Sequence, residues 1–187
     1  MQSPTSNHCT NNAADRALGE HWERQFCVLA AGRRKAFTPQ QIGRTTAASW
    51  FLHDGMNWRT TLLPDVTIWT CPGEHHEIKH KRPTSTGKFG LEKYRLEALL
   101  AFQAETQQTV LYTIHNWALA GAENSGALMP NKIDDWQTVD VRALELYVLA
   151  EHLQPVFMDT WFHGEKVRRP GYYWPTFLWM PLARWWG

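Results

Sequence analysis

Cysteine is scarce in this sequence, and no two cysteines have the close spacing of a zinc or redox motif. Cys9, Cys27 and Cys71 are an odd number at wide spacing, which argues against a disulfide framework and against a four-cysteine zinc site. No run of 18 apolar residues is present, so we predict no membrane span. The first residues also lack the basic start and apolar stretch of a secretory signal, and we therefore expect a cytoplasmic protein.

Net charge is small as well, because 19 basic residues face 18 acidic ones and leave +1 overall. Overall charge therefore does not point to a polyanionic partner, and a nucleic-acid surface would have to come from local clustering. The 187 residues include 43% hydrophobic and 20% charged side chains, as in soluble globular proteins. This length suits one domain, and only tryptophan, with 11 copies, is unusually abundant.

Hydrophobic periodicity predicts a mixed α/β fold. We expect residues 1–14 to be a flexible N-terminus and residues 15–187 to be one domain. The expected elements are a helix over 15–32, β-prone segments at 49–53 and 57–63, two strands within 62–81, a loop over 82–90, a helix over 91–106, a strand over 108–117, a helical region over 134–153 and aromatic strands over 155–182.

The two strands within 62–81 carry the clearest chemistry. Side chains two apart in a strand share a face, so Glu77 and Lys79 project together. A turn at Pro72-Gly73 would lay the strand that begins at Asp65 alongside, and would bring Asp65 near Glu77 if the register permits. Two carboxylates beside an ammonium suit a hard divalent cation such as Mg²⁺, which also binds phosphate.

Pro64-Asp65 followed by Glu77-Ile78-Lys79 resembles the motif of the PD-(D/E)XK nuclease superfamily, residue for residue. The resemblance implies a restriction-endonuclease-like fold, with a mixed central sheet flanked by helices. Its core would cover residues 15–117, and a C-terminal helix with an aromatic β-rich extension would decorate it over 118–187. The segment that follows Lys79 is similar to that of phage and prophage members. The implied activity is metal-dependent hydrolysis of phosphodiester bonds, with DNA as the expected substrate and Mg²⁺ or Mn²⁺ as cofactor.

The resemblance also assigns the metal ligands. Asp65, Glu77 and the backbone carbonyl of Ile78 would bind the ion, and a glutamate on the first helix would complete the site. Glu23 is the better candidate for that glutamate, because it shares a helix face with apolar residues. Glu20, one turn earlier, stays open as an alternative.

Lys79 would orient or deprotonate the attacking water, or neutralise the transition state, together with Asp65 and Glu77. Tyr94 is matched to a tyrosine that leads a helix beside the site, and we expect it to help position the catalytic groups. Basic residues downstream of the motif would contact nucleic acid by neutralising phosphates. The candidates for this contact are Lys81, Arg82 and Lys88.

Three other interpretations compete with a nuclease. The acidic pair and its lysine would also fit a solvated hairpin face with a weak ion pair. A nucleic-acid-binding or assembly protein would keep the fold without catalysis, and its DNA affinity would depend on salt but not on metal. A small zinc-stabilised domain is the third, with ligands of the right type at Cys71, His75, His76 and His80.

The C-terminal segment is rich in aromatic residues, namely Tyr172, Tyr173, Trp174, Phe177, Trp179, Trp185 and Trp186. We expect packing in the core or in a homodimer interface rather than stacking on nucleic-acid bases. Trp185 and Trp186 are left open between these roles. Arg168 and Arg169 are expected in a turn from which they would reach DNA.

Overall fold

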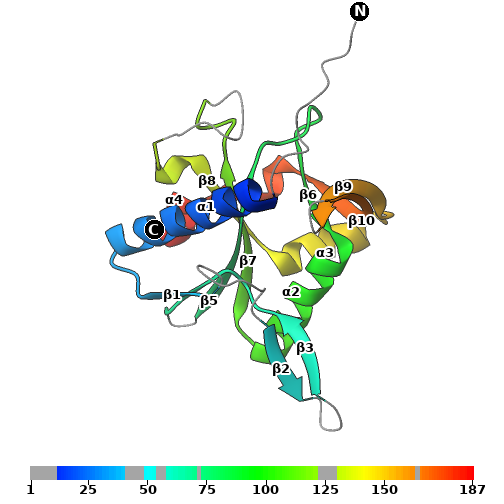
Figure 1. The fold of residues 1–187 in the computed structure, drawn as a ribbon, viewed down its shortest axis with the longest axis horizontal. Helices are drawn as coiled ribbons and strands as arrows, with labels where there is room; N and C mark the ends of the chain where they lie inside the picture. The colour runs from blue at the N-terminus through cyan, green and yellow to red at the C-terminus, as the bar shows by residue number, and fades with distance from the viewer. Residues whose placement is uncertain (1–11, 41–48, 54–57, 71–72, 122–129, 163–164) are drawn as a thin grey trace, which may run out of the picture.

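The computed structural model describes residues 12–40, 49–53, 58–70, 73–121, 130–162 and 165–187 (Figure 1). Six strands form the central sheet in the order β1-β4-β5-β7-β8-β11. Their bounds are Phe37–Pro39, Val66–Ile68, Glu74–Lys81, Thr109–Asn116, Trp136–Asp140 and Met180–Pro181, in chain order. The pair β5 and β7 is parallel and the other pairs are antiparallel. The predicted fold class, a mixed central sheet with flanking helices, is therefore confirmed.

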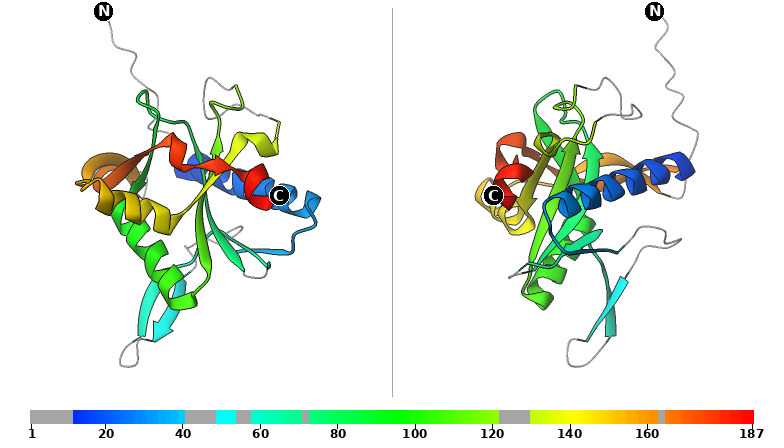
Figure 2. Two further views of the ribbon diagram at one scale, coloured as in Figure 1. Left: turned by 180° about the vertical axis from the view of Figure 1, so that it is seen from behind. Right: turned by 90° about the vertical axis from the view of Figure 1, so that its left-hand side faces the viewer.

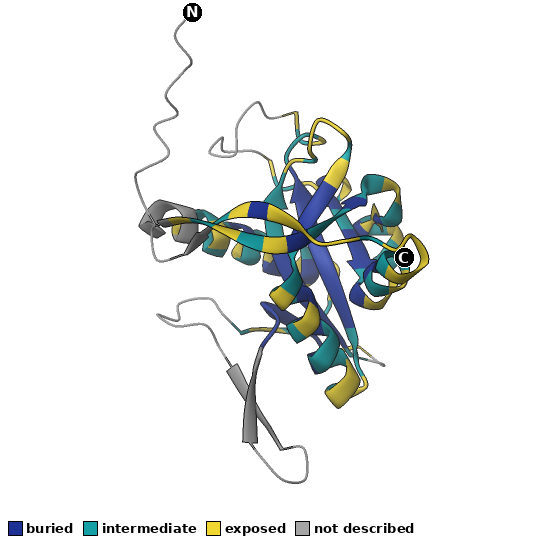
Figure 3. Cartoon of the chain, turned by 90° about the vertical axis from the view of Figure 1, so that its right-hand side faces the viewer, coloured by how far each residue is buried: buried dark blue, intermediate teal, exposed yellow. Residues whose placement is uncertain are grey.

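Helices cover both faces of this sheet, as two views of the ribbon show (Figure 2). On one face α1 (Asn12–Gly32) packs its apolar side onto β4 and β5, and α4 (Leu182–Trp186) joins the same core cluster. On the other face α2 (Lys93–Thr106) and α3 (Val141–Ala150) pack against β7. The middle strands are consequently buried on both sides (Figure 3), which agrees with the apolar residues of β7, namely Val110, Leu111, Tyr112 and Ile114.

Two smaller sheets flank this core. The strands β6 (Lys88–Glu92), β10 (Glu165–Pro175) and β9 (Val156–Phe162) form a three-stranded antiparallel sheet. A hairpin of β2 (Ser49–His53) and β3 (Trp58–Leu62) forms the other. At Gly171 the neighbouring strands approach so closely that a Cβ atom on this residue would lie 2.5 Å from the Met158 Cε atom and 2.7 Å from the Leu91 carbonyl oxygen. Glycine is thus needed where β10 crosses between its neighbours.

Several predicted boundaries were wrong. The first helix begins at Asn12, so residues 12–14 of the expected flexible terminus are helical. The strand β1 lies in a polar stretch for which no strand was predicted. Residues 88–90 belong to β6 rather than to a loop, because Phe89 is buried in the core despite the glycines around it. The predicted turn residue Pro72 lies outside the described residues.

The C-terminal third also differs from the prediction. Residues 136–140 form β8 rather than the start of a helix, and β8 and β11 both belong to the central sheet. The sheet therefore extends beyond residue 117, the expected end of the core. Arg168 and Arg169 lie within β10 and not in a turn. In the described part of the chain, no helix is both long and apolar enough to cross a membrane.

Trp185 and Trp186 connect α4 to the first residue of β5, Glu74, by hydrogen bonds. Their indole Nε1 atoms donate to the two carboxylate oxygens of the buried Glu74, at 2.9 Å to Oε2 and 2.8 Å to Oε1. The His76 Nε2 atom lies 3.2 Å from the same Oε1. Burial alone would raise the pKa of Glu74, but the hydrogen bonds from these three residues outweigh it and lower the pKa to about 2. The two tryptophans thus have a packing role in this structure.

Replacement of Glu74 by alanine is expected to destabilise the protein by about 2–3 kcal/mol, because two indole N–H groups lose their acceptor. The pKa of Glu74 falls from 4.5 to about 2 on folding, so its stabilisation is present above pH 4.5 and is lost as the pH falls towards 2. Urea unfolding at pH 7 and pH 3 measures both effects, with the exposed Glu151→Ala variant as control. Equal stability of the two variants at pH 7 would contradict the expectation.

Candidate metal site

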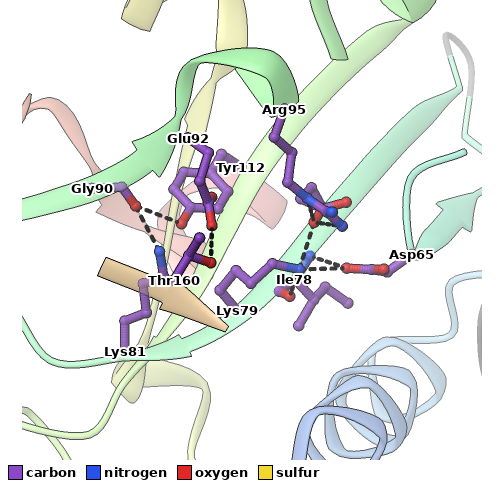
Figure 4. Close-up of polar contacts among 10 residues, drawn as sticks. Asp65, Ile78, Lys79, Lys81, Gly90, Glu92, Arg95, Tyr112 and Thr160 are labelled. Carbon is purple, nitrogen blue, oxygen red and sulfur yellow. Dashed lines mark hydrogen bonds and ion pairs between the residues drawn. The ribbon is translucent and has the colours of Figure 1, made fainter. Parts of the chain in front are cut away.

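The structure brings Asp65, Glu77 and Lys79 together, as the sequence predicted. The antiparallel register pairs Val66 of β4 with His76 of β5, so Asp65 enters β4 beside Glu77. The Asp65 Oδ2 atom accepts a hydrogen bond from the Ile78 backbone N–H at 2.7 Å. These residues lie where the short strand β4 begins, between α1 and α2 (Figure 4).

The Lys79 ammonium contacts three of the four groups proposed as metal ligands. Its Nζ atom lies 2.5 Å from Glu77 Oε1, 2.9 Å from the Ile78 carbonyl oxygen and 3.4 Å from Asp65 Oδ2. A cation therefore already sits at the centre of a set of oxygen donors. Two carboxylates and one carbonyl are hard donors of the kind that Mg²⁺ and Mn²⁺ prefer, and the residues present fit such an ion.

A third carboxylate, that of Glu23 on α1, faces the same cluster. Within the described part of the chain its Oε2 atom is buried without a hydrogen-bond partner. Burial raises the pKa of Glu23 to about 8, and the charge of Asp65 adds to the shift. Glu20 has no such environment, since its carboxylate lies 3.8 Å from Arg24 one turn along the helix. The geometry thus favours Glu23 over Glu20 as the glutamate of the first helix.

Arg95 is a member of the cluster for which no catalytic or metal-binding role was predicted. Its Nε and Nη2 atoms lie 2.6 and 2.5 Å from Glu77 Oε1 (Figure 4). The sequence held a signal for it, because Arg95 precedes the buried Leu99 by one helical turn and so lies near the apolar side of α2. A charged residue in that position needs a buried partner, and here the partner is Glu77.

The charges of the cluster balance one another. Burial would raise the pKa of Glu77, but Arg95 and Lys79 outweigh burial and lower it. Burial would lower the pKa of Lys79, but Asp65 and Glu77 outweigh it and raise the pKa, so the ammonium keeps its proton. Burial and the charge of Glu77 raise the pKa of Asp65. In the described residues no three His, Cys, Asp or Glu side chains are grouped as a ready metal cage.

Tyr94 is not brought into the cluster. Its side chain is 41% exposed on α2, and the Arg169 guanidinium lies over its ring at 5.0 Å from the centroid. The next residue, Arg95, occupies the place beside Glu77 that we expected Tyr94 to take. The sequence signal for Arg95 does not exclude Tyr94, because both residues lie on the flank of the apolar stripe of α2.

The three candidates for nucleic-acid contact have different environments. Lys81 is turned inward, where its Nζ atom donates to the Gly90 carbonyl at 2.6 Å (Figure 4). Its side chain is half-buried, and burial lowers the pKa of Lys81 to about 8. The predicted contact of this ammonium with nucleic acid would therefore compete with its hydrogen bond to Gly90. Arg82 and Lys88 are exposed, and both remain available to a polyanion.

The histidines of β5 do not converge on a common point. His75 contacts Thr67 and Gln108, whereas His76 contacts Glu74. The Nδ1 atom of His80 lies 2.9 Å from that of His115 on β7. Cys71, the remaining ligand type of the zinc interpretation, lies outside the described residues. The described histidines thus lend no support to a shared zinc site.

No family model matches the chain, and no curated protein sequence matches it. Among solved structures, the chain is similar to Hjc, a Holliday junction resolvase from Archaeoglobus fulgidus, an archaeal hyperthermophile. The identity is 12% and the TM-score is 0.49, and the match covers 90% of this chain and 100% of that chain.

Proposed function

We propose that this protein is a metal-dependent nuclease of the PD-(D/E)XK type that hydrolyses phosphodiester bonds in DNA. The observation that carries the proposal is the Lys79 ammonium, which lies among the Asp65 and Glu77 carboxylates and the Ile78 carbonyl. A solvated hairpin face would not bury both carboxylates, yet Asp65 is 3% and Glu77 1% exposed. Buried charge of this kind is concentrated at functional sites.

Asp65, Glu77, the Ile78 carbonyl and Glu23 would hold Mg²⁺ or Mn²⁺. A bound ion would supply a Lewis acid for the phosphate and lower the pKa of a coordinated water. Lys79 holds a proton at Nζ while both carboxylates face it. If a metal ion binds those carboxylate oxygens, the Lys79 ammonium would be free to orient the attacking water or to neutralise the charge that grows on the phosphate.

Further parts of the proposal concern partners. The exposed Arg82 and Lys88 would contact DNA phosphates. A homodimer through the aromatic C-terminal region would cover Phe157 and Phe177, whose side chains are 66% and 74% exposed. A cytoplasmic location agrees with the free, buried Cys27 thiol, which needs no oxidising compartment.

Metal binding is the first test. Calorimetric titration of the metal-free protein with Mn²⁺ is expected to show binding in the wild type and none in Asp65→Ala or Glu77→Ala, because each variant lacks a ligand carboxylate. The control is Glu97→Ala, which removes a carboxylate that is 61% exposed and pairs only with Lys93 among the contacts described. Binding that survives in both site variants would refute the site. A screen over duplex, branched and single-stranded DNA then identifies the substrate.

A further inference from the structure

A single carboxylate oxygen at this site is shared by two cations. Glu77 Oε1 lies 2.6 Å from Arg95 Nε, 2.5 Å from Arg95 Nη2 and 2.5 Å from Lys79 Nζ. The Glu77 side chain is 1% exposed and that of Arg95 is 23% exposed, so solvent screens these charges poorly. Charge-assisted hydrogen bonds from the fork of a guanidinium fix an acceptor in direction as well as in distance. Glu77 is therefore held by Arg95 before any metal ion arrives.

The two cations reach Glu77 from different elements. Lys79 lies on β5 beside Glu77 and has a flexible stem. Arg95 lies in the first turns of α2, which follows β6 without a loop and buries Leu96 and Leu99 in the core. The start of this helix is also tied to the three-stranded sheet, where Glu92 Oε1 accepts a hydrogen bond from Thr160 at 2.8 Å (Figure 4). The backbone that carries Arg95 is thus fixed by the core and by the three-stranded sheet.

We propose that Arg95 is a positioning residue that holds Glu77 in the metal-free protein and competes with the metal ion for its Oε1 atom. This inference rests on the metal site of the proposed function. An ion that binds Glu77 must share Oε1 with the guanidinium or displace it, and two cations so close together repel each other in a poorly screened site. Lys79 still faces Glu77 when Arg95 is removed, so the carboxylate keeps one partner. Loss of the guanidinium charge therefore strengthens metal binding.

Three variants test this competition by calorimetric titration with Mn²⁺. Arg95→Met removes the charge and keeps an unbranched apolar stem, and it is expected to bind Mn²⁺ about tenfold more tightly than the wild type, or better. Arg95→Lys keeps the charge and is expected to stay within about threefold of the wild type. Lys93→Met makes the same change of charge two residues earlier, at a side chain that is 42% exposed, and is expected to leave the affinity unchanged.

If Arg95 had only a structural role, its replacement by methionine would weaken Mn²⁺ binding instead of strengthening it. Its loss would then loosen Glu77, and Arg95→Met would bind Mn²⁺ more weakly while its thermal unfolding temperature fell. Equal or weaker binding in Arg95→Met than in the wild type overturns the competition and leaves the nuclease proposal standing. Tighter binding without cleavage of any DNA supports the competition and removes the nuclease. If neither protein binds Mn²⁺, the metal site itself is wrong and the competition falls with it.

Discussion

Replacement of Lys79 by methionine is expected to slow DNA cleavage by about 10²–10⁴-fold, the range for loss of a group that acts on a proton or on transition-state charge. The variant should fold, because Arg95 still neutralises Glu77 and the Ile78 N–H still bonds Asp65. Mn²⁺ affinity should be retained or increased, since the ammonium that lies among the ligands is gone. Single-turnover cleavage with enzyme in excess separates the chemical step from product release.

The matched control is Lys132→Met, which removes the charge of an exposed lysine outside the site and should cleave at the wild-type rate. Circular dichroism and thermal unfolding of both variants show whether lost activity reflects lost structure. A Lys79→Met enzyme that is folded and cleaves as fast as the control would remove Lys79 from the mechanism.

Glu23→Gln is expected to change how metal binding depends on pH. The pKa of Glu23 is raised to about 8, so at pH 7 most molecules carry a protonated Glu23. A carboxylate that joins the metal ligands must lose this proton, and Mn²⁺ binding at pH 7 should therefore release close to one proton. The glutamine variant should release almost none, and should cleave about 10–100-fold more slowly. Titration in two buffers of different ionisation enthalpy counts the protons.

Glu23→Gln should slow cleavage, but it should also raise the stability of the folded protein at high pH. A pKa raised from 4.5 to about 8 means that the contribution of Glu23 to stability is complete below pH 4.5 and is lost as the pH rises through 8. Glutamine escapes this loss, so Glu23→Gln should be more stable than the wild type at pH 8.5, by about 1–2 kcal/mol after allowance for solvent screening. The two proteins should agree at pH 4. Glu97→Gln, at a side chain that is 61% exposed, is the control, and identical pH profiles for all three proteins would contradict the burial of Glu23.

The core of the site could be predicted because it depends on short-range geometry. Glu77 and Lys79 share a face by the period of two in a strand, and Asp65 is joined to them through an antiparallel pair with little intervening chain. Arg95 and Lys81 could not be placed in the same way. Their side-chain directions depend on how α2 and β6 pack against β5, which is tertiary information. Both turn inward towards oxygen acceptors on other elements.

Helices and strands were predicted correctly where the hydrophobic periodicity of the sequence was strong. The helices α1 and α2 and the mostly apolar strand β7 were predicted correctly. The segment at 136–140 was not, because Trp136 and Val139 have the i, i+3 spacing of one side of a helix, and the helix that follows at Val141 extended the pattern backwards. The strand β1 is only three residues long and carries no apolar alternation, so it depends on its pairing with β4.

The parallel pairing of β5 with β7 bears on how quickly the protein folds. The β4 and β5 pair closes a short loop, but β7 can join β5 only after α2 has crossed over, and β11 pairs with β8 across most of the C-terminal third. Closing long loops is slow relative to closing short ones. We therefore expect the ligand-bearing hairpin to be structured early, with high φ-values near Val66 and Ile78 and low ones in β11. A newly made chain would then hold Asp65 and Glu77 together before α2 and β7 have packed against β5.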